Sequence, residues 1–317
     1  MAHKENKGVK IRQAQLDDAP GISEIHRSHI GRWYRRLDGE QVDVPYNNLS
    51  SGEHWGFGGP WMSVETCSVH LNNLLLQHQY PFVAMDGDDL VGEIELFSGS
   101  EGANYGKNLH IGLLYVRKGH TGEGIGSALV NKAFLFAESH DCDTVTVAST
   151  AANLGFYEQC GFSLEGTMIE LEAMTKEYDV DIVPIKPPMS LWSFTRGIPM
   201  PVGRYQSSAF HVFEQLDRYA IPEFLNVRRD RAFVNVNRHP SMFAFTRYDS
   251  LPARADVYVW SDAGAEAAIK AALTLLHKGG VEYATILLAG DDYYAMADEV
   301  DAAVKGSRGS LLRRLRN

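Results

Sequence analysis

A cluster of glycines lies between an apolar run and an amphipathic pattern near the middle of the sequence. The glycines are Gly119, Gly122, Gly124 and Gly126. Residues 111–116 are mostly apolar and β-branched or aromatic, and residues 125–136 carry apolar side chains at helical spacing. This order predicts a buried strand, a glycine turn and a helix. Backbone N–H groups at a helix start favour an anion, and glycines let a phosphate approach them, so the pattern predicts a site for a phosphate-bearing ligand.

Two common phosphate-binding motifs fit this turn poorly. A P-loop requires Lys and then Ser or Thr directly after its last glycine, whereas Ser127 and Ala128 follow Gly126. A dinucleotide-binding fingerprint requires an acidic residue at the end of the next strand, whereas Asp141 and Asp143 precede that strand. The pyrophosphate loop of a coenzyme A site remains, with a simple turn that binds nothing as the alternative.

Two separate motifs resemble those of the GNAT superfamily of N-acetyltransferases. The stretch Thr121-Gly122-Glu123-Gly124-Ile125-Gly126 resembles the loop of motif A, Gln/Arg-x-x-Gly-x-Gly/Ala, with Thr121 in place of the Gln or Arg. The segment FYEQCGF, Phe156–Phe162, resembles the family's late motif, Phe/Leu-Tyr-Glu-x-x-Gly-Phe. The resemblance covers residues 9–172 and implies an α/β GNAT fold, in which helices flank a mixed central sheet.

Hydrophobic periodicity predicts the elements that position these motifs. The expected strands are 9–15, 81–85, 90–97, 108–116, 144–148 and 168–172, and the expected helices are one through His26 and those at 63–78, 125–136 and 152–159. Asp17 and Asp18 are expected to cap the first helix. Residues 31–60 lack periodicity and predict a long irregular loop, either a wall of an acceptor site or a surface insertion.

A smaller α/β domain is expected to follow the first. We predict a GNAT acetyltransferase domain at 1–181, a stiff linker at 182–190 and the second domain at 191–317. Its expected elements are a helix at 208–219, strands at 232–236, 242–248, 256–260 and 283–289, and a helix after Asp262.

The strand–helix–strand order in this second region favours a degenerate GNAT-like unit, with an unrelated α/β cap as the alternative. The second junction carries Asp262 and Glu266, whose charges would repel a phosphate, so only the first domain is expected to bind coenzyme A. The first domain is expected to close its own core, and the basic tail at 305–317 is expected to fray.

The resemblance implies roles for particular residues. A main-chain N–H near Leu114–Val116 would polarise the thioester carbonyl, and Tyr157 would be the general acid. His110 stands where many members place the base, with Glu93 and Glu95 as alternatives that could instead mark a solvated face. Asn153 or Thr150 would bind the pantetheine arm. The full set expected at the coenzyme site is Leu114, Tyr115, Val116, Thr121, Gly122, Glu123, Gly124, Ile125, Gly126, Ser127, Asn153 and Tyr157.

Composition limits the function classes. The net charge of −10 over 317 residues argues against non-specific nucleic-acid binding and mildly favours a cationic acceptor. The first eight residues are polar, and no apolar run is long enough to cross a membrane. The three cysteines, Cys67, Cys142 and Cys160, are scattered. Together these features predict a cytoplasmic protein without a metal site.

We therefore predict an N-acetyltransferase that uses acetyl-CoA and acts on a small-molecule or peptide amine, not on nucleic acid or at a membrane. The alternative is a non-catalytic CoA-binding regulatory module. The sequence leaves the acceptor and the oligomeric state open.

Overall fold

The chain forms two compact units. The computed structural model describes residues 8–37, 40–101, 105–204, 207–216, 227–248 and 251–315, so the polar segment at 1–7 lies outside the described residues. Unit 1 consists of Met1–Phe97 with Ile111–His140, and unit 2 consists of Ser98–His110 with Asp141–Asn317. The division of the chain by function into 1–181, 182–190 and 191–317 stays a prediction.

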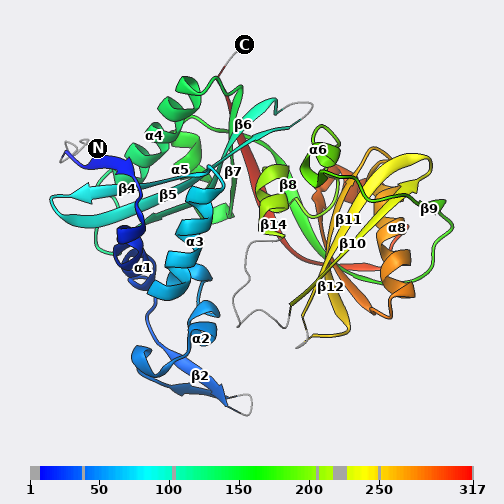
Figure 1. Ribbon diagram of the computed structural model, residues 1–317, viewed down its shortest axis with the longest axis horizontal. Helices are drawn as coiled ribbons and strands as arrows, with labels where there is room; N and C mark the ends of the chain where they lie inside the picture. Colours follow the sequence, from blue (N-terminus) through cyan, green and yellow to red (C-terminus); the bar gives the residue numbers. More distant parts are fainter. Residues whose placement is uncertain are drawn as a thin grey trace. The chain divides into compact units, whose positions relative to one another are not determined.

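Unit 1 contains a small sheet with helices on both faces (Figure 1). Its strands follow the order β1-β4-β5-β6. The elements are β1 (Lys10–Gln13), α1 (Ala19–Arg27), α3 (Val64–Leu76), β4 (Tyr80–Asp86), β5 (Asp89–Ser100), β6 (Lys107–Val116) and α4 (Ile125–Ser139). Each lies where hydrophobic periodicity predicted an element of that type. Residues after Phe97 in β5 and before Ile111 in β6 belong to unit 2.

Side chains alternate along β4 and β5 between two differently covered faces. Val83 of β4 is fully buried in a cluster with residues of α1 and α3. Its neighbour Phe82 lies on the opposite face, where its ring is 5.5 Å from that of Phe136 in α4. Val83 stands opposite Glu93 in the antiparallel register, so the side chain of Glu93 shares the face covered by α1 and α3.

The segment predicted as an irregular loop contains regular structure. Two short strands, β2 (Tyr34–Leu37) and β3 (Glu40–Asp43), pair as an antiparallel hairpin, and α2 (Ser51–Trp55) follows. Figure 1 shows the hairpin beyond α2, away from β4 and β5. The strands show no hydrophobic alternation because neither has a buried residue, and this is why the prediction of a loop was wrong.

The predicted cap of α1 also differs in detail. Asp18 stands at the N-cap position, but its carboxylate makes no capping hydrogen bond to the helix. It accepts instead from the guanidinium of Arg12, at 2.6 and 2.7 Å, and from the backbone N–H of Gln15. The ion pair and hydrogen bonds lower the pKa of Asp18, against the opposing effect of its burial. This aspartate therefore ties β1 to the start of α1.

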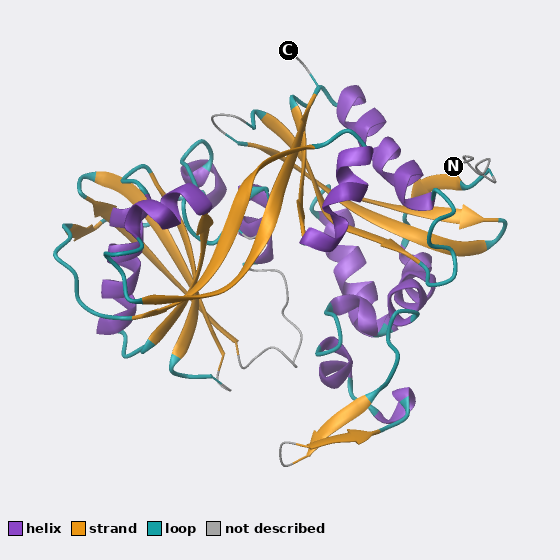
Figure 2. Cartoon of the chain, turned by 180° about the vertical axis from the view of Figure 1, so that it is seen from behind, coloured by secondary structure: helices purple, strands orange, loops and turns teal. Residues whose placement is uncertain are grey.

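Unit 2 is a larger sheet with helices packed against it (Figure 2). The part of β6 before Ile111 belongs to this unit. The strands that follow it in the sheet have the order β7-β14-β8-β13-β12-β11-β10-β9. The strands are β7 (Thr144–Ser149), β8 (Ser163–Met174), β9 (Ile182–Pro184), β10 (Val227–Val236), β11 (His239–Tyr248), β12 (Arg254–Ser261), β13 (Tyr283–Ala289) and β14 (Ala302–Arg314). The helices are α5 (Leu154–Gln159), α6 (Leu191–Thr195), α7 (Ala209–Gln215), α8 (Ala265–Lys278) and α9 (Gly290–Met296). The end of the helix predicted at 208–219 lies outside the described residues.

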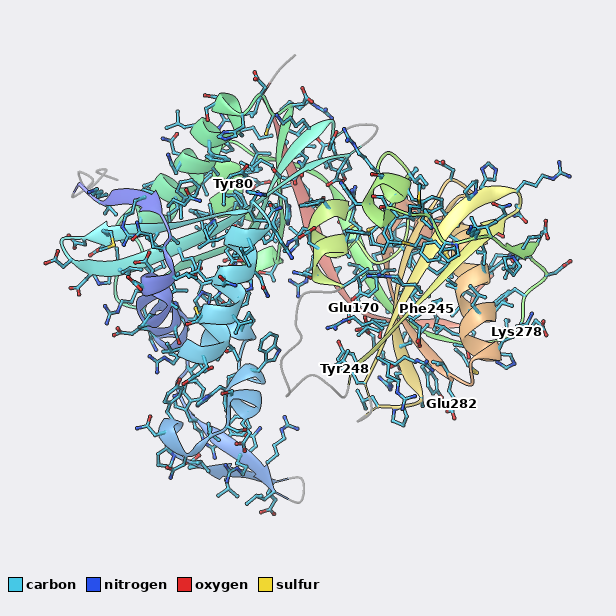
Figure 3. All side chains as sticks on the ribbon, in the orientation of Figure 1. Tyr80, Glu170, Phe245, Tyr248, Lys278 and Glu282 are labelled. Atoms are coloured by element: carbon cyan, nitrogen blue, oxygen red, sulfur yellow. The ribbon has the colours of Figure 1, made fainter. Side chains whose placement is uncertain are left out.

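Residues on alternate positions of β11 and β12 fill two cores. Phe243 and Val259 pack on the face covered by α8, whereas Met242 and Trp260 pack on the face covered by α7. β12 and β13 are parallel, and α8 connects them, as the strand–helix–strand pattern predicted. Lys278 ends α8 on its exposed side (Figure 3), where its charge complements the helix dipole.

Three expectations for the C-terminal region were wrong. The described part of the predicted frayed tail belongs to β14, which pairs with β7 on one side and with β8 on the other. β8 also pairs with β13, so the core around β8 is completed by later strands rather than closed by the first 181 residues alone. Ile182–Pro184 of the predicted linker forms β9 and pairs with β10.

The position of β14 predicts a large effect from a core substitution near the end of the chain. Leu311 is fully buried, so Leu311→Ala should lower the free energy of unfolding by about 2–5 kcal/mol. Val304 on the same strand is 54% exposed, and Val304→Ala should change it by less than about 0.5 kcal/mol. Urea denaturation of both variants measures the difference. Equal and small effects would contradict a paired, buried β14.

Candidate functional site

The turn between β6 and α4 has the backbone geometry that a phosphate site requires. Gly119, Gly122 and Gly124 adopt φ angles of 100°, 86° and 83°, a region that other residues rarely occupy. A Cβ atom at Gly122 would meet no atom within 4 Å, so the space beside it is open. Residues 121–124 are exposed, whereas Ile125 is 2% exposed and anchors the start of α4 in the core.

The start of α4 leaves several backbone donors without an acceptor. Within the described part of the chain, the N–H groups of Gly122, Gly124, Ile125, Gly126 and Ser127 donate to no backbone or side-chain oxygen, whereas the N–H of Ala128 donates to the carbonyl of Gly124. Orphan N–H groups at a helix start carry a partial positive charge that favours an anion. The geometry predicted for the pyrophosphate loop is therefore present, although contact with a ligand stays a prediction.

Two of the predicted bases are buried carboxylates in unit 1. Glu93 is 1% and Glu95 is 2% exposed, so the alternative of a solvated face is wrong. Each carboxylate meets an imidazole: Glu93 Oε2 lies 2.7 Å from Nε2 of His26 in α1, and Glu95 Oε1 lies 2.6 Å from Nε2 of His70 in α3. The indole N–H of Trp61 also donates to Glu95 Oε1, at 2.9 Å.

Burial and the neighbouring charge of Glu95 favour the neutral form of Glu93. Burial, with a further contribution from the charge of Glu95, raises the pKa of Glu93 well above its ordinary value. Burial lowers the pKa of His26 from 6.5 to about 3. At neutral pH we therefore assign a proton to Glu93, whose O–H donates to a neutral His26.

An aromatic stack connects this buried cluster to the end of β6. The imidazole of His26 lies between two rings, with its centroid 4.2 Å from that of Tyr115 and 5.0 Å from that of Trp61. Tyr115 is 38% exposed, so the stack runs from the surface inward. The buried cluster therefore positions Tyr115, one of the residues whose backbone N–H is predicted to polarise the thioester. Contact of Leu114, Tyr115 or Val116 with a thioester stays a prediction.

An exposed imidazole lies at the same end of β6. Nε2 of His29 is 2.8 Å from the carbonyl oxygen of Val116. Because a carbonyl only accepts, Nε2 carries the proton, and Nδ1 of the neutral ring is left as an acceptor. The ring also meets Tyr115 edge-on, at 5.5 Å between centroids. Unlike Glu93 and Glu95, His29 is open to solvent.

The remaining predicted residues belong to unit 2. His110 is fully buried, and its Nδ1 is 3.1 Å from the hydroxyl of Thr146, which fits a structural role. Tyr157 is 8% exposed and packs edge-on against Phe162, and its burial raises its pKa to about 12. Asn153 is exposed, before α5. The roles of Tyr157 as acid and of Asn153 or Thr150 in binding the pantetheine arm stay predictions.

Two searches of the described residues gave negative results. Within the described ranges, no three His, Cys, Asp or Glu side chains are grouped so that they could hold a metal ion. None of the helices in those ranges combines the length and apolar character needed to cross a membrane.

Comparison with known families agrees with this geometry. Residues 48–162 match the model of the acetyltransferase (GNAT) family, a range that includes β5, β6, the glycine turn and α4. The match covers that segment of the chain, and it agrees with the GNAT N-acetyltransferase domain that the two sequence motifs indicated. A search of curated proteins gave no match.

Several solved structures share the fold over nearly the whole chain. A candidate acetyltransferase from Pyrococcus horikoshii is 17% identical, with 99% of this chain and 93% of that chain covered and a TM-score of 0.54. A GCN5-related N-acetyltransferase from Anabaena variabilis is 11% identical, with 97% and 73% covered and a TM-score of 0.61. The glucosamine N-acetyltransferase region of a fungal β-N-acetylglucosaminidase is 12% identical, with 96% and 38% covered and a TM-score of 0.54. At such identities the likeness establishes the fold alone, and the predicted fold class is confirmed.

Sequence reasoning missed the imidazoles and the indole that complete the site. His26 and His29 stand three positions apart in the sequence HRSH, the first in the last turn of α1 and the second just beyond its C-cap. Glu93 and Glu95 alternate within an apolar strand, and buried acids need partners. This pattern signalled a buried polar cluster, but it did not identify His70 or Trp61.

The charge assignment of the Glu93–His26 pair predicts how stability depends on pH. In the unfolded chain Glu93 binds its proton below about pH 4.5 and His26 below about pH 6.5, from their ordinary pKa values. Between these pH values the Glu93–His26 pair binds one proton in the folded chain and one in the unfolded chain. The pair therefore adds no pH dependence to the free energy of unfolding in this range. The stabilisation that the Glu93–His26 pair contributes falls above about pH 6.5, as the pH approaches the folded-state pKa of Glu93. It also falls below about pH 4.5, as the pH approaches the folded-state pKa of His26.

Substitution of Glu93 should expose the titration of His26 alone. In Glu93→Gln the folded state no longer holds the Glu93 proton, so stability should fall as pH is lowered from 6.5 to 4.5, by up to about 1.4 kcal/mol per pH unit relative to the unsubstituted protein. The matched control is Glu40→Gln, an exposed position on β3. Urea midpoints across this range measure the effect, and parallel profiles for all three proteins would refute the assignment.

Proposed function

We propose that the protein is an N-acetyltransferase that binds acetyl-CoA at the start of α4 and transfers the acetyl group to an amine. The observation that carries the proposal is the glycine turn after β6, whose backbone donors lack acceptors within the described residues and where a Cβ atom at Gly122 would meet no atom within 4 Å. Its location inside the segment that matches the GNAT family supports the choice of coenzyme A over other anionic ligands.

The residues at the turn fit the pyrophosphate of coenzyme A. The N–H groups of Gly122, Gly124, Ile125 and Gly126 would donate to its oxygens, aided by the dipole of the 15-residue helix α4. Acetyl-CoA supplies the activated acetyl thioester. A backbone N–H of Tyr115 or Val116 would polarise the thioester carbonyl, and the stack on His26 holds that part of β6 in place.

The amine must lose a proton when its nitrogen bonds to the acetyl carbon and the carbon–sulfur bond breaks. We assign the acceptor role to Nδ1 of His29, because this imidazole is exposed at the end of β6 and its Nε2–H is held by Val116. Glu93, Glu95 and His110 are too deeply buried to meet an amine directly. The departing sulfur takes a proton to give free coenzyme A.

The acceptor is proposed as a small-molecule or peptide amine. Support comes from the fungal structural neighbour, which is described as a glucosamine N-acetyltransferase region. The net charge of −10 is consistent with an acceptor other than nucleic acid, and a cytoplasmic location stays a prediction from composition.

Release of free thiol tests the function directly. The protein is incubated with acetyl-CoA and a panel of amines, and calorimetry measures acetyl-CoA binding in parallel. Amine-dependent thiol release supports the enzyme. Binding without turnover across the panel would reject it in favour of the CoA-binding regulatory module.

A bulky residue in the turn should block the coenzyme. Gly124 precedes α4 with φ of 83°, so Gly124→Val should weaken acetyl-CoA binding by about 10-fold or more by straining the turn and filling space beside the free amides. Gly264 precedes α8 with φ of 84° and provides a control, since Gly264→Val also places a side chain at a positive φ before a helix, away from the proposed site. Calorimetry should show weakened binding for the first variant only. Unchanged affinity in Gly124→Val would remove the site from this turn.

Loss of the His29 imidazole should slow transfer without weakening coenzyme binding. We expect His29→Gln to lower kcat by about 10²–10⁴-fold and to leave the acetyl-CoA affinity close to normal. Raising the pH should recover part of the rate, since more of the amine is then unprotonated. His239→Gln, at an exposed position of β11, serves as the control. An unaltered kcat in His29→Gln would assign proton removal to another group.

A further inference from the structure

A surface cavity of unit 1 lies beside the end of β6 and is not used by the coenzyme loop. Its volume is about 330 Å³. Its walls come from α1, from the segment around the β2–β3 hairpin and from the residue that follows β6. The lining residues are Glu24, Arg27, Ser28, Trp33, Tyr46 and Arg117.

Hydrogen bonds fix this cavity next to the proposed reaction centre. Arg117 follows Val116 directly, and its backbone N–H donates to the carbonyl of Val91 at 2.9 Å. The hydroxyl of Ser28 accepts from the backbone N–H of Lys118, also at 2.9 Å. Ser28 precedes His29 in the sequence, and Nε2 of His29 lies 2.8 Å from the carbonyl oxygen of Val116, the residue before Arg117. Two lining residues of the cavity are therefore chain neighbours of the groups that hold this imidazole. We take this cavity as the place where the acceptor amine binds.

The cavity holds one guanidinium without an ionic partner. Arg117 pairs with Glu24, which neutralises both. Arg27 donates from Nε to the carbonyl of Ser23, at 3.3 Å, and across the described ranges no carboxylate pairs with it. Its terminal nitrogens therefore remain available for a planar bidentate contact with a carboxylate. The cavity is locally cationic although the whole chain carries a charge of −10.

The opposite wall is aromatic. The guanidinium carbon of Arg27 lies 4.6 Å from the ring centroid of Tyr46, and the rings of Tyr46 and Trp33 meet edge-on at 5.1 Å. The guanidinium of Arg27 stacks on the ring of Tyr46, so the orientation of Arg27 is fixed before any ligand binds. A ligand that reaches Arg27 with a carboxylate would lay its apolar part against these rings.

From this arrangement, which rests on the proposed acetyl transfer, we propose that the acceptor is an amine that bears a carboxylate and an apolar or aromatic body, such as an aromatic amino acid. Arg27 binds the carboxylate, and Trp33 and Tyr46 contact the body. This reverses the mild expectation of a cationic acceptor drawn from net charge, because the local charge of the cavity is opposite to that of the chain.

Matched pairs of amines test the proposal on the full-length protein. Phenylalanine and tyrosine are compared with phenethylamine and tyramine, which lack only the carboxylate, and 2-aminoethyl phosphate tests a phosphate instead. Thiol release should show a kcat/KM about 10- to 100-fold higher for the carboxylated member of each pair. Arg27→Gln should remove this preference by raising KM for the amino acids, while the acetyl-CoA affinity stays close to normal. Arg27→Lys should retain part of it, since the charge remains.

The control and the outcomes separate this proposal from the proposed function. Arg32→Gln removes an exposed guanidinium that pairs with Asp43 on the hairpin and should leave the preference intact. Equal turnover of both members of each pair, a preference for the phosphate, or an unchanged preference in Arg27→Gln would overturn the carboxylate site while acetyl transfer stands. Absence of thiol release with every amine, despite bound acetyl-CoA, would overturn both.

Discussion

Unsatisfied backbone donors at the start of α4 are the constraint from which the rest of the site follows. A chain that ends a buried strand and begins a helix within eight residues, Arg117–Gly124, cannot pair all of its N–H groups internally. Glycines at φ angles between 83° and 100° make the turn possible and keep side chains out of the space beside the donors. An anionic ligand would satisfy these donors, and the buried Ile125 keeps them in position.

The buried carboxylates impose a second constraint on unit 1. Glu93 and Glu95 lie on the same face of β5, so both cannot be charged in an apolar environment without a large cost. Glu93 is neutral and bonds to His26, and Glu95 bonds to His70 and accepts from the indole N–H of Trp61. These bonds tie α1 and α3 to the strand. Through the stack on Tyr115 they also determine where the end of β6 lies, and with it the exposed His29.

Local patterns were readable from the sequence, and long-range pairings were not. The glycine turn and the helix after it were predicted because both depend on residues that are close in the sequence. The glycines allow positive φ angles, and the apolar residues that follow stand at helical spacing. The partners of Glu93 and Glu95 lie 67 and 25 positions away, and neither histidine stands out by its type or neighbours. The role of β14 was missed for a related reason. Its basic residues suggested a solvated tail, but Lys305 pairs with Glu172 on the neighbouring strand, at 2.9 Å.

The junctions β6–α4 and β12–α8 differ in their electrostatics, and this contrast supports the central claim that coenzyme A binds once, at α4. Gly122 and Gly124 present free donors, whereas Asp262 and Glu266 place carboxylates at the start of α8. Calorimetric titration of the full chain with acetyl-CoA tests this most directly. The account predicts one molecule bound per chain. A stoichiometry of two, or no binding, would contradict it.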